Sequence, residues 1–138
     1  MVDKIKSILN HIPKWLLSGL TLALILWLTL APHPTGDIDL PLFPGVDKVV
    51  HVIMFGFFAL MVCVDYMRAH KWASMSLTTV SCIAFATALF GVGIEFIQEW
   101  MGIGRSLEIM DMLADSAGAM AACGVWAVIE GRFASPQE

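Results

Sequence analysis

Four apolar runs separated by short polar segments dominate the sequence. The runs cover about residues 15–31, 49–67, 74–98 and 107–129. Each approaches the roughly 20 residues that a helix needs to cross the hydrocarbon core of a bilayer. The pattern therefore predicts an all-α integral membrane protein, folded as a four-helix bundle with short loops.

The segments between the runs predict where helices start. A basic, amphipathic piece precedes the first run, as in a signal peptide, but the run exceeds the roughly 7–15 apolar residues usual there and Pro32 follows it directly. We therefore expect an uncleaved first span. After a proline-rich loop, Asp47 stands at a natural N-cap position for the second helix, and Ser106 can cap the fourth.

Composition agrees with a membrane protein. The 138 residues are 58% hydrophobic and only 14% charged, against roughly 25% charged in an average globular domain. We expect a single membrane domain over residues 1–138, because no room is left for a second globular module. The eight Lys and Arg residues form no cluster, so we expect no nucleic-acid partner. Cys63, Cys82 and Cys123 stand singly in apolar runs, as buried small hydrophobes do.

The basic residues predict the orientation, since Lys and Arg near span ends favour the cytoplasm. With four spans, six of them fall on one side of the membrane and two on the other. The larger group is Lys4, Lys6, Lys14, Arg68, Lys71 and Arg132, and the smaller group is Lys48 and Arg105. Both termini are therefore predicted to be cytoplasmic.

The segment from Gly91 to Gly118 carries polar residues where lipid or a packed core would not favour them. A carboxylate at the centre of a spanning helix costs roughly 2.5–3.5 kcal/mol on insertion scales, so such groups usually face a bundle interior or a cavity. The predicted topology brings the end of the third helix and the starts of the second and fourth to the outer face. We therefore predict one polar pocket there, formed by Asp47, Lys48, His51, Glu95, Gln98, Arg105, Asp111 and Asp115.

Three of these residues have the chemistry of proton transfer. A carboxylate and an imidazole that lie close together can exchange a proton as general acid and base, so His51, Glu95 and Asp111 are the candidate catalytic residues. The same residues without chemistry would form a buried ion network. The sequence leaves open which of the two exists, and therefore whether the protein is an enzyme.

The other five residues are candidates for binding. Lys48 and Arg105 are the residue types that hold a phosphate or a carboxylate. Gln98 and Asp115 would orient the proton-handling groups, and Asp47 lies on the same helix face as the imidazole one turn later.

Metal binding is a weaker hypothesis at this stage. His51, Glu95, Asp111 and Asp115 offer ligand atoms, but only one histidine is available among them and no HExxH-type spacing occurs. We therefore expect neither a metal nor another cofactor.

Four short motifs follow one another between residues 47 and 118. They are Asp47-Lys48-x-x-His51-x-x-x-Phe55, Glu95-x-x-Gln98, Gly104-Arg105-Ser106 and Asp111-x-x-x-Asp115-x-x-Gly118. Together they resemble the VanZ-like family of small bacterial membrane proteins, named for an accessory protein of glycopeptide resistance associated with teicoplanin. The resemblance implies a bacterial cytoplasmic membrane and a link to the cell envelope. The sequence departs from the family pattern at Asp115, where Asn is usual.

One functional prediction and two alternatives follow. We predict that the outward-facing pocket binds the headgroup of an envelope lipid or lipid-linked precursor, as substrate or ligand, with an effect on glycopeptide susceptibility. The alternative is a non-enzymatic interaction protein with a structural ion network, and homo-oligomerisation is left open. Transport is disfavoured, because the cytoplasmic halves of the spans offer only Asp65 and Glu130, so no proton relay crosses the membrane.

Overall fold

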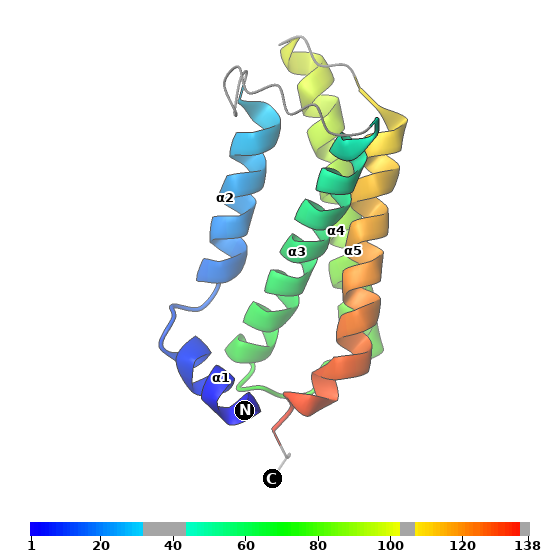
Figure 1. Ribbon diagram of the computed structural model, residues 1–138. Coiled ribbons are helices and arrows are strands. Elements are labelled where there is room, and N and C mark those ends of the chain that lie inside the picture. Colours follow the sequence, from blue (N-terminus) through cyan, green and yellow to red (C-terminus); the bar gives the residue numbers. More distant parts are fainter. Residues whose placement is uncertain (32–43, 103–106, 136–138) are drawn as a thin grey trace.

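The computed structural model describes residues 1–31, 44–102 and 107–135, and this part of the chain is helical without strands. Its elements are α1 (Val2–Asn10), α2 (Leu16–Leu30), α3 (Val46–Ala69), α4 (Leu77–Met101), α5 (Ile109–Ile129) and the 3₁₀ helix η1 (Glu130–Arg132). The long helices run alongside one another, and α1 and η1 lie at the same end (Figure 1). The all-α prediction is confirmed.

Three helices are long and apolar enough to cross a membrane, namely α3, α4 and the helix at 109–132. The first predicted span, 15–31, forms the apolar helix α2, which has 15 residues. At 1.5 Å per residue this helix rises roughly 22 Å, less than the roughly 30 Å of a bilayer core. Three predicted spans are therefore confirmed by length and composition, while the crossing of α2 stays a prediction.

Glycines allow α5 to approach its neighbours closely. A Cβ atom on Gly118 would overlap the carbonyl oxygen of Val52 on α3, and a Cβ on Gly56 would lie 3.1 Å from the carbonyl oxygen of Gly118. On α4, a Cβ on Gly91 would lie 2.7 Å from the Cβ and Oδ2 atoms of Asp115. Small residues permit such backbone approach within lipid. These contacts fix how far apart the three helices stand.

A second packed region lies at the α1 end. Trp126 is 3% exposed, donates from Nε1 to Sδ of Met75 at 3.2 Å and stacks on Phe133. This tryptophan is therefore a core residue. Cys63 and Cys123 are buried in the same core, as predicted, whereas Cys82 is exposed, so the prediction of a buried side chain is wrong for this residue.

A buried ion pair connects the start of α2 to the end of α3. Asp65 is fully buried, and its Oδ2 atom accepts from the backbone N–H of Ser18 at 2.9 Å and from its hydroxyl at 2.8 Å. Arg68 pairs with Asp65 and donates to the carbonyl of Ile12. The segment before α2 is therefore held against α3 by hydrogen bonds to side chains.

The predicted helix starts need correction at two places, and a third prediction is not tested. Gly45, in the left-handed conformation with φ +85°, is the N-cap of α3, and Asp47 lies in the first turn, where its charge favours the helix dipole. Ser76 caps α4, so this helix begins at 77 instead of 74. Ser106 lies outside the described residues, and Glu108, which precedes α5, makes no side-chain capping bond.

Candidate functional site

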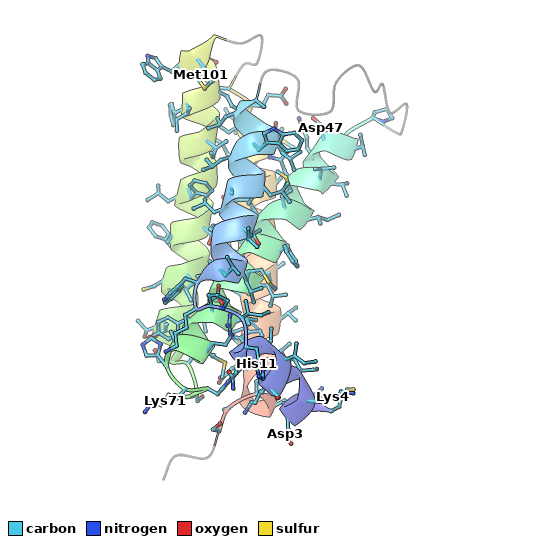
Figure 2. The ribbon with its side chains drawn as sticks, turned by 90° about the vertical axis from the view of Figure 1, so that its left-hand side faces the viewer. Asp3, Lys4, His11, Asp47, Lys71 and Met101 are labelled. Carbon is cyan, nitrogen blue, oxygen red and sulfur yellow. The ribbon has the colours of Figure 1, made fainter. Side chains whose placement is uncertain are left out.

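Acidic side chains gather at one end of the helices, and the labelled lysines Lys4 and Lys71 lie at the other (Figure 2). Figure 2 shows Asp47 and Met101 at one end, and Lys4, His11 and Lys71 at the opposite end. At the first end, polar residues from α3, α4, α5 and the turn before α5 lie together. We call this set the polar cluster: Asp47, Lys48, His51, Glu95, Glu108, Asp111 and Asp115.

Lys48 neutralises one side of the polar cluster. Its Nζ atom lies 2.6 Å from Oδ2 of Asp47 and 2.8 Å from Oδ1 of Asp111, and it also pairs with Glu108. It donates hydrogen bonds to Asp47 and Glu108, and its charge also lies beside Asp111. Because three carboxylates already balance its charge, this geometry favours Lys48 as an internal counter-ion over a group that holds an incoming anion.

His51 is held in one orientation by Asp115. The imidazole Nδ1 lies 2.8 Å from Oδ1 of the Asp115 carboxylate, which is fully buried. An ionised carboxylate only accepts hydrogen bonds, so this contact assigns a ring proton to Nδ1. The Nε2 atom lies 3.9 Å from Oδ2 of Asp111. The second ring nitrogen therefore faces Asp111.

Glu95 brings a deeply buried carboxylate from α4 to the same place. Glu95 is 1% exposed, and its Oε2 atom accepts a hydrogen bond from the backbone N–H of Glu108 at 3.1 Å. The other oxygen, Oε1, is buried and has no hydrogen-bond partner in the part of the chain that the structure describes. Buried polar atoms are normally paired, so an orphaned oxygen of this kind calls for an explanation.

One predicted site residue is not part of this arrangement. Gln98 is buried, but its Nε2 atom donates to the carbonyl of Thr29 at 2.8 Å, so it connects α4 to α2. Arg105 lies outside the described residues. The remaining six candidates are brought together as the sequence predicted, with Asp47 at the exposed rim.

Glu108 is the site residue that the sequence prediction did not include. It pairs with Lys48 through its side chain and donates to Glu95 through its backbone N–H. Its position three residues before Asp111 was the available signal, because residues at that spacing face the same way on a helix.

A comparison with known protein families identifies the family of this chain. The VanZ/LLP1 family profile matches residues 4–130, nearly the whole chain. The chain belongs to the VanZ/LLP1 family. With its three long apolar helices, this VanZ/LLP1 chain is a membrane protein, and the resemblance seen in the sequence is confirmed. No curated protein and no solved structure matches it.

The charge of the polar cluster limits what this VanZ/LLP1 site can bind. Among the described residues it holds five carboxylates and one ammonium group. The excess of carboxylates favours partners that donate hydrogen bonds or carry positive charge. A bare anion would need a further positive group.

Proposed function

We propose that this membrane protein binds the polar headgroup of an envelope lipid or lipid-linked precursor in the polar cluster. The observation that carries the proposal is the Oε1 atom of Glu95, which is buried and without a partner among the described residues. Buried carboxylate oxygens are normally paired, so this atom favours a partner that the described residues do not supply. A hydroxyl or amine group of a headgroup would donate a hydrogen bond to it.

An apolar groove supports a lipid over a water-soluble ligand. The groove has a volume of about 530 Å³ and lies between α2, α3 and α4, lined by side chains such as Leu22, Phe58 and Phe90. The ring of Phe90 lies 5.9 Å from that of Phe55, which in turn stacks with His51. An acyl chain in the groove would therefore place its headgroup near the polar cluster.

The proposal assigns distinct roles to the candidate residues. Glu95 contacts the headgroup, and His51 and Asp111 are placed to accept or donate protons there. Arg105 is the proposed contact for a phosphate, since Lys48 is already paired with three carboxylates. The proposal includes an effect of this binding on susceptibility to glycopeptides.

The proposal also includes an orientation. The polar cluster would face the outside of the bacterial cytoplasmic membrane, with both termini in the cytoplasm. Basic residues of the described chain gather at the opposite end, where Lys4 and Lys71 lie (Figure 2). Lys and Arg near span ends favour the cytoplasmic side.

The test is to identify lipids that copurify with the protein. We expect mass spectrometry of the wild-type protein to detect an envelope lipid that is absent from Arg105→Ala. Glu99→Gln should keep the lipid, because Glu99 is an exposed acid of α4 and its bond to the Leu107 backbone can be kept by Gln. Equal lipid content in wild-type protein and Arg105→Ala would refute the proposed contact.

A further inference from the structure

His51, Glu95 and Asp111 form a compact set of potential metal ligands. One nitrogen or carboxylate oxygen from each residue lies within 4.8 Å of the other two. The three side chains come from α3, α4 and α5, which explains why no local sequence motif marks them. We propose that these three residues bind a divalent transition-metal ion. The inference goes beyond lipid binding and does not depend on it.

The hydrogen bond that orients His51 is of the kind found at metal-binding histidines. A histidine that binds a metal usually donates its other ring N–H to a carboxylate, which fixes the ring and makes the ligating nitrogen more basic. The contact between Nδ1 and Asp115 at 2.8 Å has this form, and it leaves Nε2 on the side of Asp111. Asp115 would act as a positioning residue behind the imidazole.

Glu95 provides the independent observation. It is 1% exposed, yet Oε1 lacks a hydrogen-bond partner in the described residues. Leaving such a carboxylate oxygen unpaired in a dry environment is costly. A bound cation would satisfy this oxygen and offset the excess of negative charge around it.

A second acidic set competes for a cation but already has one. Asp47, Glu108 and Asp111 also lie within 4.8 Å of one another. The ammonium group of Lys48 pairs with all three of them. An ion is therefore expected between His51, Glu95 and the second oxygen of Asp111, where no lysine stands.

The donor set and its spacing select the kind of ion. An imidazole together with carboxylates suits Zn²⁺ and other first-row transition metals, whereas Mg²⁺ and Ca²⁺ prefer oxygen ligands alone. Bonds of about 2.0–2.2 Å place the ligand atoms of a tetrahedral zinc ion roughly 3–3.5 Å apart. Nε2 of His51 and Oδ2 of Asp111 are 3.9 Å apart, so a small side-chain movement closes the site. Three protein ligands leave a position for water or a ligand oxygen.

The test uses Zn²⁺ alone, with full-length protein purified in detergent without a polyhistidine tag and treated with chelator. Calorimetric titration of the wild-type protein is expected to show one bound Zn²⁺ per chain. Thermal unfolding is expected to show a higher apparent Tm with Zn²⁺ than without it. Substitution of a residue that hydrogen-bonds to a metal ligand typically weakens metal binding roughly 10–100-fold. Glu95→Gln changes a ligand itself and should weaken Zn²⁺ binding by more than this. Asp115→Asn should weaken it within that range, and Glu99→Gln should bind as the wild type does.

Several results would overturn the proposal. Absence of stoichiometric Zn²⁺ binding and of a Tm shift in the wild-type protein refutes it, whatever the variants do. Binding that survives Glu95→Gln but is lost in Glu108→Gln places the ion in the other acidic set. If Glu95→Gln does not fold, the visible absorption of Co²⁺ added to the wild-type protein decides, because a ligand set containing imidazole nitrogen gives a spectrum unlike that of the aqueous ion.

Discussion

Nδ1 of His51 and Oδ1 of Asp115 lie 2.8 Å apart, although 64 residues separate them in the sequence. The contact joins α3 to α5 beside the place where α4 contributes the buried Glu95. Asp115 is fully buried, so water cannot hydrogen-bond to it freely, and within the described residues its carboxylate depends on the imidazole as donor. This pair therefore links the stability of the helix packing to the polar cluster.

Removal of His51 should destabilise the protein more than removal of charge from Asp115. His51→Ala leaves a buried carboxylate without its donor, and loss of one partner of a buried pair costs about 3–5 kcal/mol. Asp115→Asn keeps an acceptor oxygen for the imidazole and should cost less. Thermal unfolding in detergent measures both variants, and an unchanged Tm in His51→Ala would contradict the coupling.

Gly118→Ala should separate α3 from α5. The added Cβ would overlap the carbonyl oxygen of Val52, which cannot move aside as a flexible side chain could. Overpacking of this kind costs about 1–3 kcal/mol. Gly124→Ala is the matched control on the same helix, because its Cβ would meet nothing within 4 Å. Equal Tm values for the two variants would show that the close contact does not determine the packing.

Arg68→Ala should affect stability without affecting the polar cluster. The variant leaves Asp65 buried without its charge partner and removes the contact to Ile12, so a loss of about 3–5 kcal/mol is expected. Lipid content per folded molecule should stay at the wild-type value, because this pair lies at the other end of α3. A lipid loss equal to that of Glu95→Gln would show that lipid content follows stability alone.

Cysteine labelling should establish the orientation. In a background without native cysteines, Met101→Cys is expected to react with a membrane-impermeant maleimide in intact spheroplasts, whereas His11→Cys should react only after permeabilisation. The two positions lie at opposite ends of the molecule (Figure 2). The reverse pattern would place the polar cluster in the cytoplasm.

The sequence was sufficient for the helices and for most of the polar cluster. Long apolar runs and helical spacing placed His51, Glu95 and Asp111 on faces that meet, and the structure brings them together. Helix ends were less predictable. Asp47 is a residue type that often caps helices and was therefore expected at the start of α3, but the cap is Gly45 in the left-handed conformation.

Pairings between distant residues could not be derived from the sequence. Gln98 was expected beside the imidazole, but it bonds to the backbone of α2 at Thr29. Lys48 was expected to hold an anion, whereas three carboxylates of the protein itself converge on its charge. Both outcomes depend on the relative depth and rotation of neighbouring helices, which local periodicity does not specify.

The ratio of bound lipid to protein in Glu95→Gln tests the central claim most directly. Glutamine has nearly the same shape, so the variant should reach the membrane at close to the wild-type level. The ratio, measured by mass spectrometry of purified protein, should fall about tenfold, because a neutral amide accepts a weaker hydrogen bond than a carboxylate, a difference of about 1–1.5 kcal/mol. Normalisation to protein removes any effect of abundance, and Glu99→Gln should match the wild type. An unchanged ratio in Glu95→Gln would contradict headgroup binding at the polar cluster.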